Sequence, residues 1–137
     1  MKIVICGSMS SSELMAQIGE KLESKSFEVI LPKHTKEYAS GIMKLENSKE
    51  STENKIKDNL IKDYFNKIAQ SDAVLIVNVP KNNIPNYIGG NSFLEMAFAH
   101  VLDKKIYLLN PIPDMIYTDE IIALRPVVIH GNLDLIV

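Results

Sequence analysis

The chain has 137 residues, of which 46% are hydrophobic and 23% charged, and its formal net charge is −2. This length suits one domain, and the composition is that of a globular protein rather than a disordered or fibrous one. Because the lysines show no basic stripe, we expect no nucleic-acid binding. A single cysteine excludes an internal disulfide framework. This cysteine and the three scattered histidines provide no convincing metal site.

The sequence also lacks the signals that direct a chain to a membrane. No apolar run approaches the roughly 20 residues needed to span a bilayer. The residues after Met1 do not follow the basic, apolar and small-residue pattern of a secretory signal. We therefore expect a cytoplasmic protein without membrane contact, folded as a single domain over residues 1–137.

The first elements in chain order are a strand, a helix and a second strand. Residues 2–6 form a short β-prone run that stops at a glycine. Ser10 and Glu13 have the spacing of a capping box, which predicts a helix starting near Ser10. Residues 27–31 are again apolar and β-prone, and the proline that follows ends the expected strand.

A polar segment at about 33–52 follows the second strand and is poorly periodic. A connection of this length without regular structure is uncommon in a compact domain and is usually a lid or an insertion. We expect a flexible loop here, with one short helical turn around Ile42, Met43 and Leu45.

The second half of the chain alternates helices and strands. The expected elements are a helix at 56–68, a strand at 73–77, a helix at 94–102, a strand at 106–109, a short helix at 119–124 and a strand at 127–129. The unbroken apolar run at 73–77 is typical of a strand covered on both faces in a parallel sheet. The pattern predicts an α/β protein with a flavodoxin-like, doubly wound five-stranded parallel sheet and helices on both faces. Such sheets bind ligands at the carboxyl ends of the strands.

The segment between the first strand and helix is a candidate phosphate site. It consists of Gly7, Ser8, Met9 and Ser10. A glycine permits close approach of the backbone, and serine hydroxyls and helix N–H groups bind anions. The alternative is a plain turn with a capping serine. The dinucleotide and P-loop fingerprints are missing, so we expect neither NAD nor ATP hydrolysis and predict no cofactor.

A second candidate segment leads into the helix at 94–102. Gly89, Gly90, Asn91 and Ser92 precede Glu95, which has apolar neighbours. A carboxylate among apolar side chains can act as a nucleophile or as a general acid or base. The alternative is a partly solvated glutamate that favours the helix N-terminus.

Two further features have less specific interpretations. Asn110 ends the fourth strand at the ligand edge, where it either donates to a sugar or base or shapes the turn before a proline. Met96, Phe98 and Val101 give the helix at 94–102 more apolar surface than one sheet face needs, which predicts a homodimer.

Four segments together resemble the nucleoside 2-deoxyribosyltransferase superfamily, which includes the 2'-deoxynucleoside 5'-phosphate N-hydrolases. They are Ile5-Cys6-Gly7-Ser8, Ser71-Asp72-Ala73-Val74, the turn from Tyr87 into Glu95, and Lys104-Lys105-Ile106-Tyr107. The resemblance implies a small-molecule nucleoside or nucleotide as partner, with Glu95 as nucleophile. It also implies that Gly7 and Ser8 hold a 5'-phosphate.

The sequence departs from the family pattern at four positions. Val4 stands where the family commonly has a tyrosine, Ser10 where the hydrolase branch has an arginine, and Asn91 where a glycine is usual. Tyr64 aligns with a family aspartate, so the candidate substrate-binding residue Asp63 is one position out of register and about 100° away on a helix.

The leading prediction is cleavage or transfer of the N-glycosidic bond of a (deoxy)nucleoside or its 5'-monophosphate. The alternative, favoured by Val4 and Ser10, is an inactive nucleotide-binding or sensing module of the same fold. A flavin-binding protein of this shape is a further alternative, although Tyr87 is the one nearby aromatic side chain.

Overall fold

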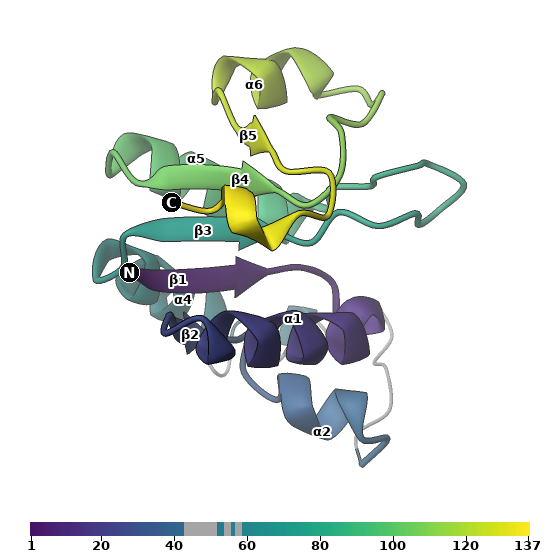
Figure 1. Ribbon diagram of the computed structural model, residues 1–137. Helices are drawn as coiled ribbons and strands as arrows, with labels where there is room; N and C mark the ends of the chain where they lie inside the picture. Colours follow the sequence, from purple (N-terminus) through teal and green to yellow (C-terminus); the bar gives the residue numbers. More distant parts are fainter. Residues whose placement is uncertain (43–51, 54–55, 57–58) are drawn as a thin grey trace.

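A single parallel sheet forms the centre of the protein, in a computed structural model that describes residues 1–42, 52–53, 56 and 59–137. Its strands are β1 (Lys2–Cys6), β2 (Glu28–Ile30), β3 (Ala73–Ile76), β4 (Lys105–Leu108) and β5 (Val127–Val128). The spatial order is β2-β1-β3-β4-β5, and all neighbouring strands are parallel. This order confirms the predicted flavodoxin-like, doubly wound topology (Figure 1).

Helices cover both faces of this sheet. They are α1 (Ser12–Ser24), α2 (Thr35–Ala39), α4 (Leu60–Ala69), α5 (Gly90–Val101) and α6 (Thr118–Ala123), with short 3-10 helices η1 (Met9–Ser11) and η2 (Leu133–Leu135). In Figure 1, α1 and η2 lie in front of the sheet, whereas α4 and α5 lie behind it.

The alternation of side chains along β1 divides the core into two halves. Ile3 and Ile5 pack on the face covered by α1, and Val4 and Cys6 pack on the face covered by α4 and α5. Successive side chains of a strand point to opposite faces, so the unbroken apolar run is required here because both faces are covered. The same alternation turns the Cys6 side chain toward α5.

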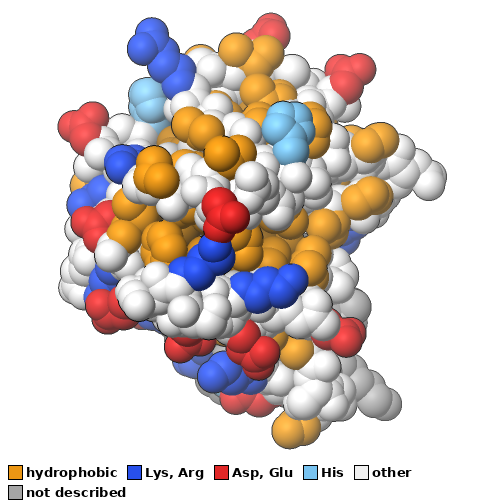
Figure 2. All heavy atoms as spheres, viewed as in Figure 1, with side chains coloured by type: hydrophobic (Ala, Val, Ile, Leu, Met, Phe, Trp, Pro, Cys, Tyr) orange, Lys and Arg blue, Asp and Glu red, His pale blue; other side chains and the backbone are white. Residues whose placement is uncertain are grey.

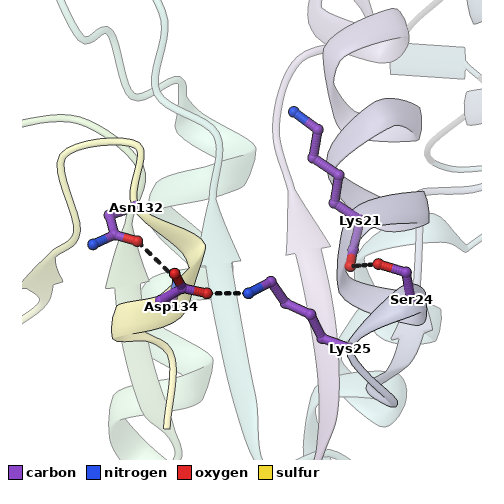
Figure 3. Close-up of polar contacts among 5 residues, drawn as sticks. All are labelled: Lys21, Ser24, Lys25, Asn132 and Asp134. Carbon is purple, nitrogen blue, oxygen red and sulfur yellow. Dashed lines mark hydrogen bonds and ion pairs between the residues drawn. The ribbon is translucent and has the colours of Figure 1, made fainter.

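The C-terminal segment completes the layer on the α1 side. Ile129 and Ile136 belong to the same core half as α1. At the surface, the ammonium of Lys25 pairs with Asp134, and Asn132 caps η2 (Figure 3). These contacts join the end of α1 to the segment that carries η2.

Two local expectations about helix starts are wrong, and the segment expected as a loop at 33–52 is described only in part. In its described part α2 forms at Thr35–Ala39 and packs against α1, and Met43 and Leu45 lie outside the described residues. The helix expected at 94–102 begins four residues earlier, at Gly90, which places Glu95 in its second turn. The helix expected to begin near Ser10 instead begins at Ser12 after a 3-10 turn.

The capping box between Ser10 and Glu13 does not form. Ser8 caps η1, because its hydroxyl accepts the Ser10 N–H at 3.3 Å. The side chain of Ser11, which precedes α1, makes no capping hydrogen bond. The chain enters this helix through a tight 3-10 turn, which leaves the hydroxyls of Ser8 and Ser10 beside each other.

The described part of the chain contains no helix long and apolar enough to cross a membrane. It also contains no cluster of His, Cys, Asp and Glu side chains suited to a metal ion.

Figure 2 shows hydrophobic side chains gathered near the middle of the face that carries β5 and the C-terminal segment. Val127, Leu135 and Val137 are among the exposed hydrophobic residues of these segments.

Candidate functional site

The carboxyl end of β1 brings Glu95 against Cys6. On α5, Ser92, Met96 and Ala99 mark the buried face. Glu95 lies three residues after Ser92 and four before Ala99, so it shares this face. Cys6, the last residue of β1, points to the same side, and its thiol donates a hydrogen bond to the Glu95 carboxyl.

The Glu95 carboxyl is strongly desolvated, although the residue as a whole is only partly buried. Burial raises its pKa from 4.5 to about 8, and the hydrogen bond from Cys6 acts in the opposite direction. Burial also raises the pKa of the Cys6 thiol well above its ordinary value, and the neighbouring Glu95 charge adds to this. Cys6 is thus a neutral hydrogen-bond donor rather than a reactive thiolate.

Tyr64 is the third member of this group and comes from α4. Its side chain is buried, and its hydroxyl donates a hydrogen bond to the carbonyl of Ile5. Burial raises the pKa of Tyr64 well above its ordinary value, with further contributions from Cys6, Glu95 and Asp63. Because the phenol donates its proton to the Ile5 carbonyl of β1, Tyr64 holds the end of this strand beside Glu95.

Asp63 does not join this group. Its carboxylate forms an ion pair with Lys67 one turn along α4, at 3.0 Å, and both side chains are partly exposed. Tyr64 and Ile68 form the buried stripe of the helix instead. The one-residue offset from the family aspartate therefore turns Asp63 to the helix surface and Tyr64 to the core.

The turn after β1 is fixed by packing as well as by hydrogen bonds. A Cβ on Gly7 would lie 2.9 Å from the Met15 sulfur and 3.4 Å from the carbonyl oxygen of Val77, so a larger residue would require the buried Met15 side chain to move. Met9 packs its side chain against the core. Of the four predicted residues here, Ser8 and Ser10 are the ones whose side chains remain available at the edge.

Lys81 joins these serines from a distant loop. It lies between β3 and α5, in a loop that extends beyond the carboxyl ends of the strands (Figure 1). Its ammonium donates to the Ser8 hydroxyl at 2.9 Å, and the Ser8 and Ser10 hydroxyls are also 2.9 Å apart. The sequence analysis missed Lys81, because nothing in the local pattern indicates a contact across 73 residues.

The glycine-rich turn before α5 leaves open surface in front of the helix. A Cβ on Gly90 would meet nothing within 4 Å, and one on Gly89 would meet only Tyr87 at 3.5 Å. Asn91 is exposed and Ser92 is buried. Neither glycine has a positive φ, so this turn requires glycine for neither its backbone conformation nor its packing.

Asn110 is engaged in the protein rather than free for a ligand. Its side-chain amide donates to the carbonyl of Asn78 at 2.8 Å, and its backbone N–H donates to the Asn78 side chain at 2.9 Å. The Asn78 amide in turn donates to the carbonyls of Asn110 and Pro111. This reciprocal pair supports the turn-shaping interpretation, and the buried Asn78 was not singled out from the sequence.

An aromatic pair borders the start of α5. Phe93 stacks on Tyr117 with ring centroids 4.6 Å apart, and the Tyr117 hydroxyl donates to the carbonyl of Ile88. Phe65 and Phe98 meet edge to face at 5.2 Å and pack α4 against α5. These contacts hold the helix that carries Glu95 in place from both sides.

Comparison with known proteins supports the fold. No protein-family model matches the chain, and no curated protein matches it. The structure is similar to that of the Clostridium botulinum CMP N-glycosidase BcmB, with a TM-score of 0.50 and 13% sequence identity over 95% of this chain and 90% of that chain. At this identity the similarity bears on the fold alone, and it agrees with the doubly wound fold predicted from the sequence.

Proposed function

We propose that this chain cleaves the N-glycosidic bond of a nucleoside or nucleoside 5'-monophosphate, with Glu95 as the nucleophile. The observation that carries the proposal is the desolvated carboxyl of Glu95 beside the end of β1. This edge of a doubly wound sheet is where ligands bind. The fold that the chain shares with a CMP N-glycosidase supports the same chemistry.

The reaction follows from the geometry of a carboxylate facing an anomeric carbon. Ionised Glu95 attacks C1' of the sugar while the bond from C1' to the base nitrogen breaks, and that electron pair leaves with the base. The resulting glycosyl ester is resolved by water, or by a second base in a transferase. The adjacent carboxylate stabilises the oxocarbenium-like transition state, and a site with little water strengthens that effect.

The protonation state of Glu95 sets the pH range of this reaction. Its pKa of about 8 means that much of the carboxyl is protonated near neutral pH. The nucleophile is the ionised form, so we expect kcat/KM to rise with pH and level off above about pH 8. The Cys6 hydrogen bond favours the ionised form and extends activity toward lower pH.

The same raised pKa is also the observation that favours a second candidate, a nucleotide-binding module without catalysis. A protonated Glu95 is a hydrogen-bond donor, suited to a sugar hydroxyl or to an acceptor on a base. Val4, which lies where the family commonly has a tyrosine, supplies no polar group beside it. Such a module would bind nucleotides without releasing the base.

The deciding experiment is base release, measured by chromatography, from a panel of ribo- and deoxyribonucleosides and their 5'-monophosphates. The wild-type protein is compared with Glu95→Gln and with Glu20→Gln, an exposed position on α1. We expect release by wild type and Glu20→Gln and none by Glu95→Gln. Nucleotide-induced thermal stabilisation without any release would favour the binding module instead.

We also propose a homodimer, for which the outer face of α5 is the candidate surface. Val101 is 77% exposed and Leu94 is 42% exposed, whereas Met96 is fully buried in the core and adds nothing to this face. Sedimentation of Val101→Glu should show a monomer if α5 forms the interface. The matched variant Ile116→Glu, at a fully exposed position elsewhere, should remain dimeric.

A further inference from the structure

Three hydrogen-bonding groups converge on one exposed hydroxyl oxygen at the carboxyl edge of the sheet. The oxygen is Oγ of Ser8, which accepts the Ser10 N–H at 3.3 Å and the Lys81 ammonium at 2.9 Å. The Ser10 hydroxyl lies 2.9 Å from the same atom. A neutral hydroxyl oxygen is a modest acceptor for so many donors, and an anionic oxygen placed there would be a much stronger one.

The positive charge of Lys81 has no acidic partner within ion-pair distance in the part of the chain that the structure describes. Lysines at protein surfaces commonly pair with carboxylates or extend into solvent, whereas this one folds back onto a serine. An anion is therefore the partner that this cluster lacks.

Backbone contacts hold Lys81 in this position. Lys81 and Ile84 exchange two backbone hydrogen bonds, of 3.1 and 2.9 Å, which close a narrow turn in the β3–α5 loop. The Tyr87 N–H bonds to the Val79 carbonyl at 3.1 Å and closes the base of the same loop. The lysine is thus presented by a turn of defined shape.

The cluster also spans the point where the winding of the sheet reverses. Ser8 follows β1, and Lys81 lies in the loop after β3, the strand beside β1 at the switch point of the order β2-β1-β3-β4-β5. Cys6, which contacts Glu95, is two residues before Ser8, so their Cα atoms are at most about 7 Å apart. Glu95 and the cluster are therefore at the same strand end, as a ligand that contacts both would require.

We propose that Lys81, with Ser8 and Ser10, binds the phosphate of a nucleoside 5'-monophosphate and makes the monophosphate, rather than the free nucleoside, the substrate. The hydrolase branch that the sequence resembles has an arginine where this chain has Ser10. Here Lys81 supplies the positive charge from the β3–α5 loop. This inference rests on the proposed function for its catalytic consequence. The binding of the monophosphate is independent of catalysis.

The test compares Lys81→Ala and Lys81→Arg with Lys21→Ala, which removes an exposed lysine of α1 outside the cluster. Binding of each 5'-monophosphate and its nucleoside is measured by calorimetry, and kcat/KM is measured for any pair that reacts. Loss of one charge-assisted contact should weaken monophosphate binding about 10- to 100-fold in Lys81→Ala and leave nucleoside binding unchanged. Lys81→Arg should retain most of the affinity, and Lys21→Ala all of it.

Each outcome separates this inference from the proposed function. Equal loss for nucleoside and monophosphate, or no loss, would overturn the role of Lys81 even if the protein releases base. A selective loss of monophosphate binding without base release by wild type would support Lys81 and contradict the glycosidase proposal. Failure of every monophosphate to bind the wild-type protein would overturn the phosphate site.

Discussion

Two groups of polar side chains lie at the end of β1, one buried and one exposed. Glu95, Cys6 and Tyr64 are packed between the sheet, α4 and α5, where burial raises the pKa of each. Ser8, two residues after Cys6, and Lys81, from the β3–α5 loop, lie at the surface and are joined by a hydrogen bond of 2.9 Å. The first group therefore depends on the exclusion of water, and the second on electrostatic attraction that salt can screen.

This contrast assigns different tasks to the two groups. A desolvated carboxylate is suited to stabilise a positive charge that develops during a reaction. An exposed ammonium is suited to capture and position an anion. Changes in pH should act mainly through the buried group, and changes in salt concentration mainly through the exposed one.

The largest expected effect comes from removing the carboxyl of the buried group. We expect Glu95→Ala to lower kcat by about 10³-fold or more, because the nucleophile is lost. Azide or formate, which can occupy the vacated space and attack C1', should restore part of the activity. Glu20→Gln, at an exposed position on α1, should keep its kcat and gain nothing from azide. Full activity of Glu95→Ala would contradict the assignment.

The next effect is on stability and comes from the raised pKa of Glu95, which is about 8 compared with 4.5 ordinarily. Between these two values the folded protein holds a proton that the unfolded chain has lost. This group's contribution to the free energy of unfolding is therefore fully present below pH 4.5 and falls as pH rises toward 8, by at most about 1.4 kcal/mol per pH unit.

Urea unfolding of the wild type and Glu95→Gln from pH 5 to 8 measures this contribution. Glu95→Gln should be the more stable protein at pH 8, and its stability should depend less on pH. Parallel pH profiles for the two proteins would show that Glu95 is not desolvated. Glu20→Gln, on exposed α1, is the control for a change in net charge alone.

A smaller effect is expected from Tyr64, the support of the buried group. Tyr64→Phe keeps the ring and removes the buried hydrogen bond to the Ile5 carbonyl. The expected cost is about 1–2 kcal/mol in the free energy of unfolding, seen as a lower midpoint of urea denaturation with an unchanged slope. An unchanged midpoint would mean that water replaces the phenol at this position.

The smallest effect is predicted for Asp63, which sequence comparison placed near the substrate. Its ion pair with Lys67 is partly exposed, and such pairs contribute at most about 0.5 kcal/mol. Asp63→Asn should therefore leave both the thermal midpoint and the KM for nucleotide almost unchanged. A several-fold rise in the KM for nucleotide would show that Asp63 contributes to substrate binding.

The sheet could be predicted from the sequence because each strand carries its own signal. The run at 73–77 is apolar throughout, which occurs when both faces of a parallel strand are covered, and β3 lies there at Ala73–Ile76. Helix starts were harder to predict. The start of α5 at Gly90 was missed because two glycines and an asparagine are poor helix formers, and packing of Ser92 and Met96 overrides that preference.

The site could be predicted only where its residues are close in sequence. Glu95 was identified from its apolar neighbours, and Ser8 and Ser10 from their place after a strand. The contacts of Tyr64 with Ile5 and of Lys81 with Ser8 join residues 59 and 73 positions apart. The pairing of β1 with β3 and the packing of α4 on the sheet bring these residues together, so no local pattern could reveal them.

The central claim, that Glu95 carries the sugar during the reaction, has a direct test. A 2-fluorinated analogue of the accepted nucleotide slows both steps by destabilising the oxocarbenium-like transition state, so the glycosyl ester accumulates when the base is a good leaving group. Peptide mass spectrometry of the trapped wild-type protein should locate one fluorosugar on Glu95, and Glu95→Gln should carry none. A protein that turns over the natural nucleotide but carries the sugar on another residue, or on none, would contradict the account.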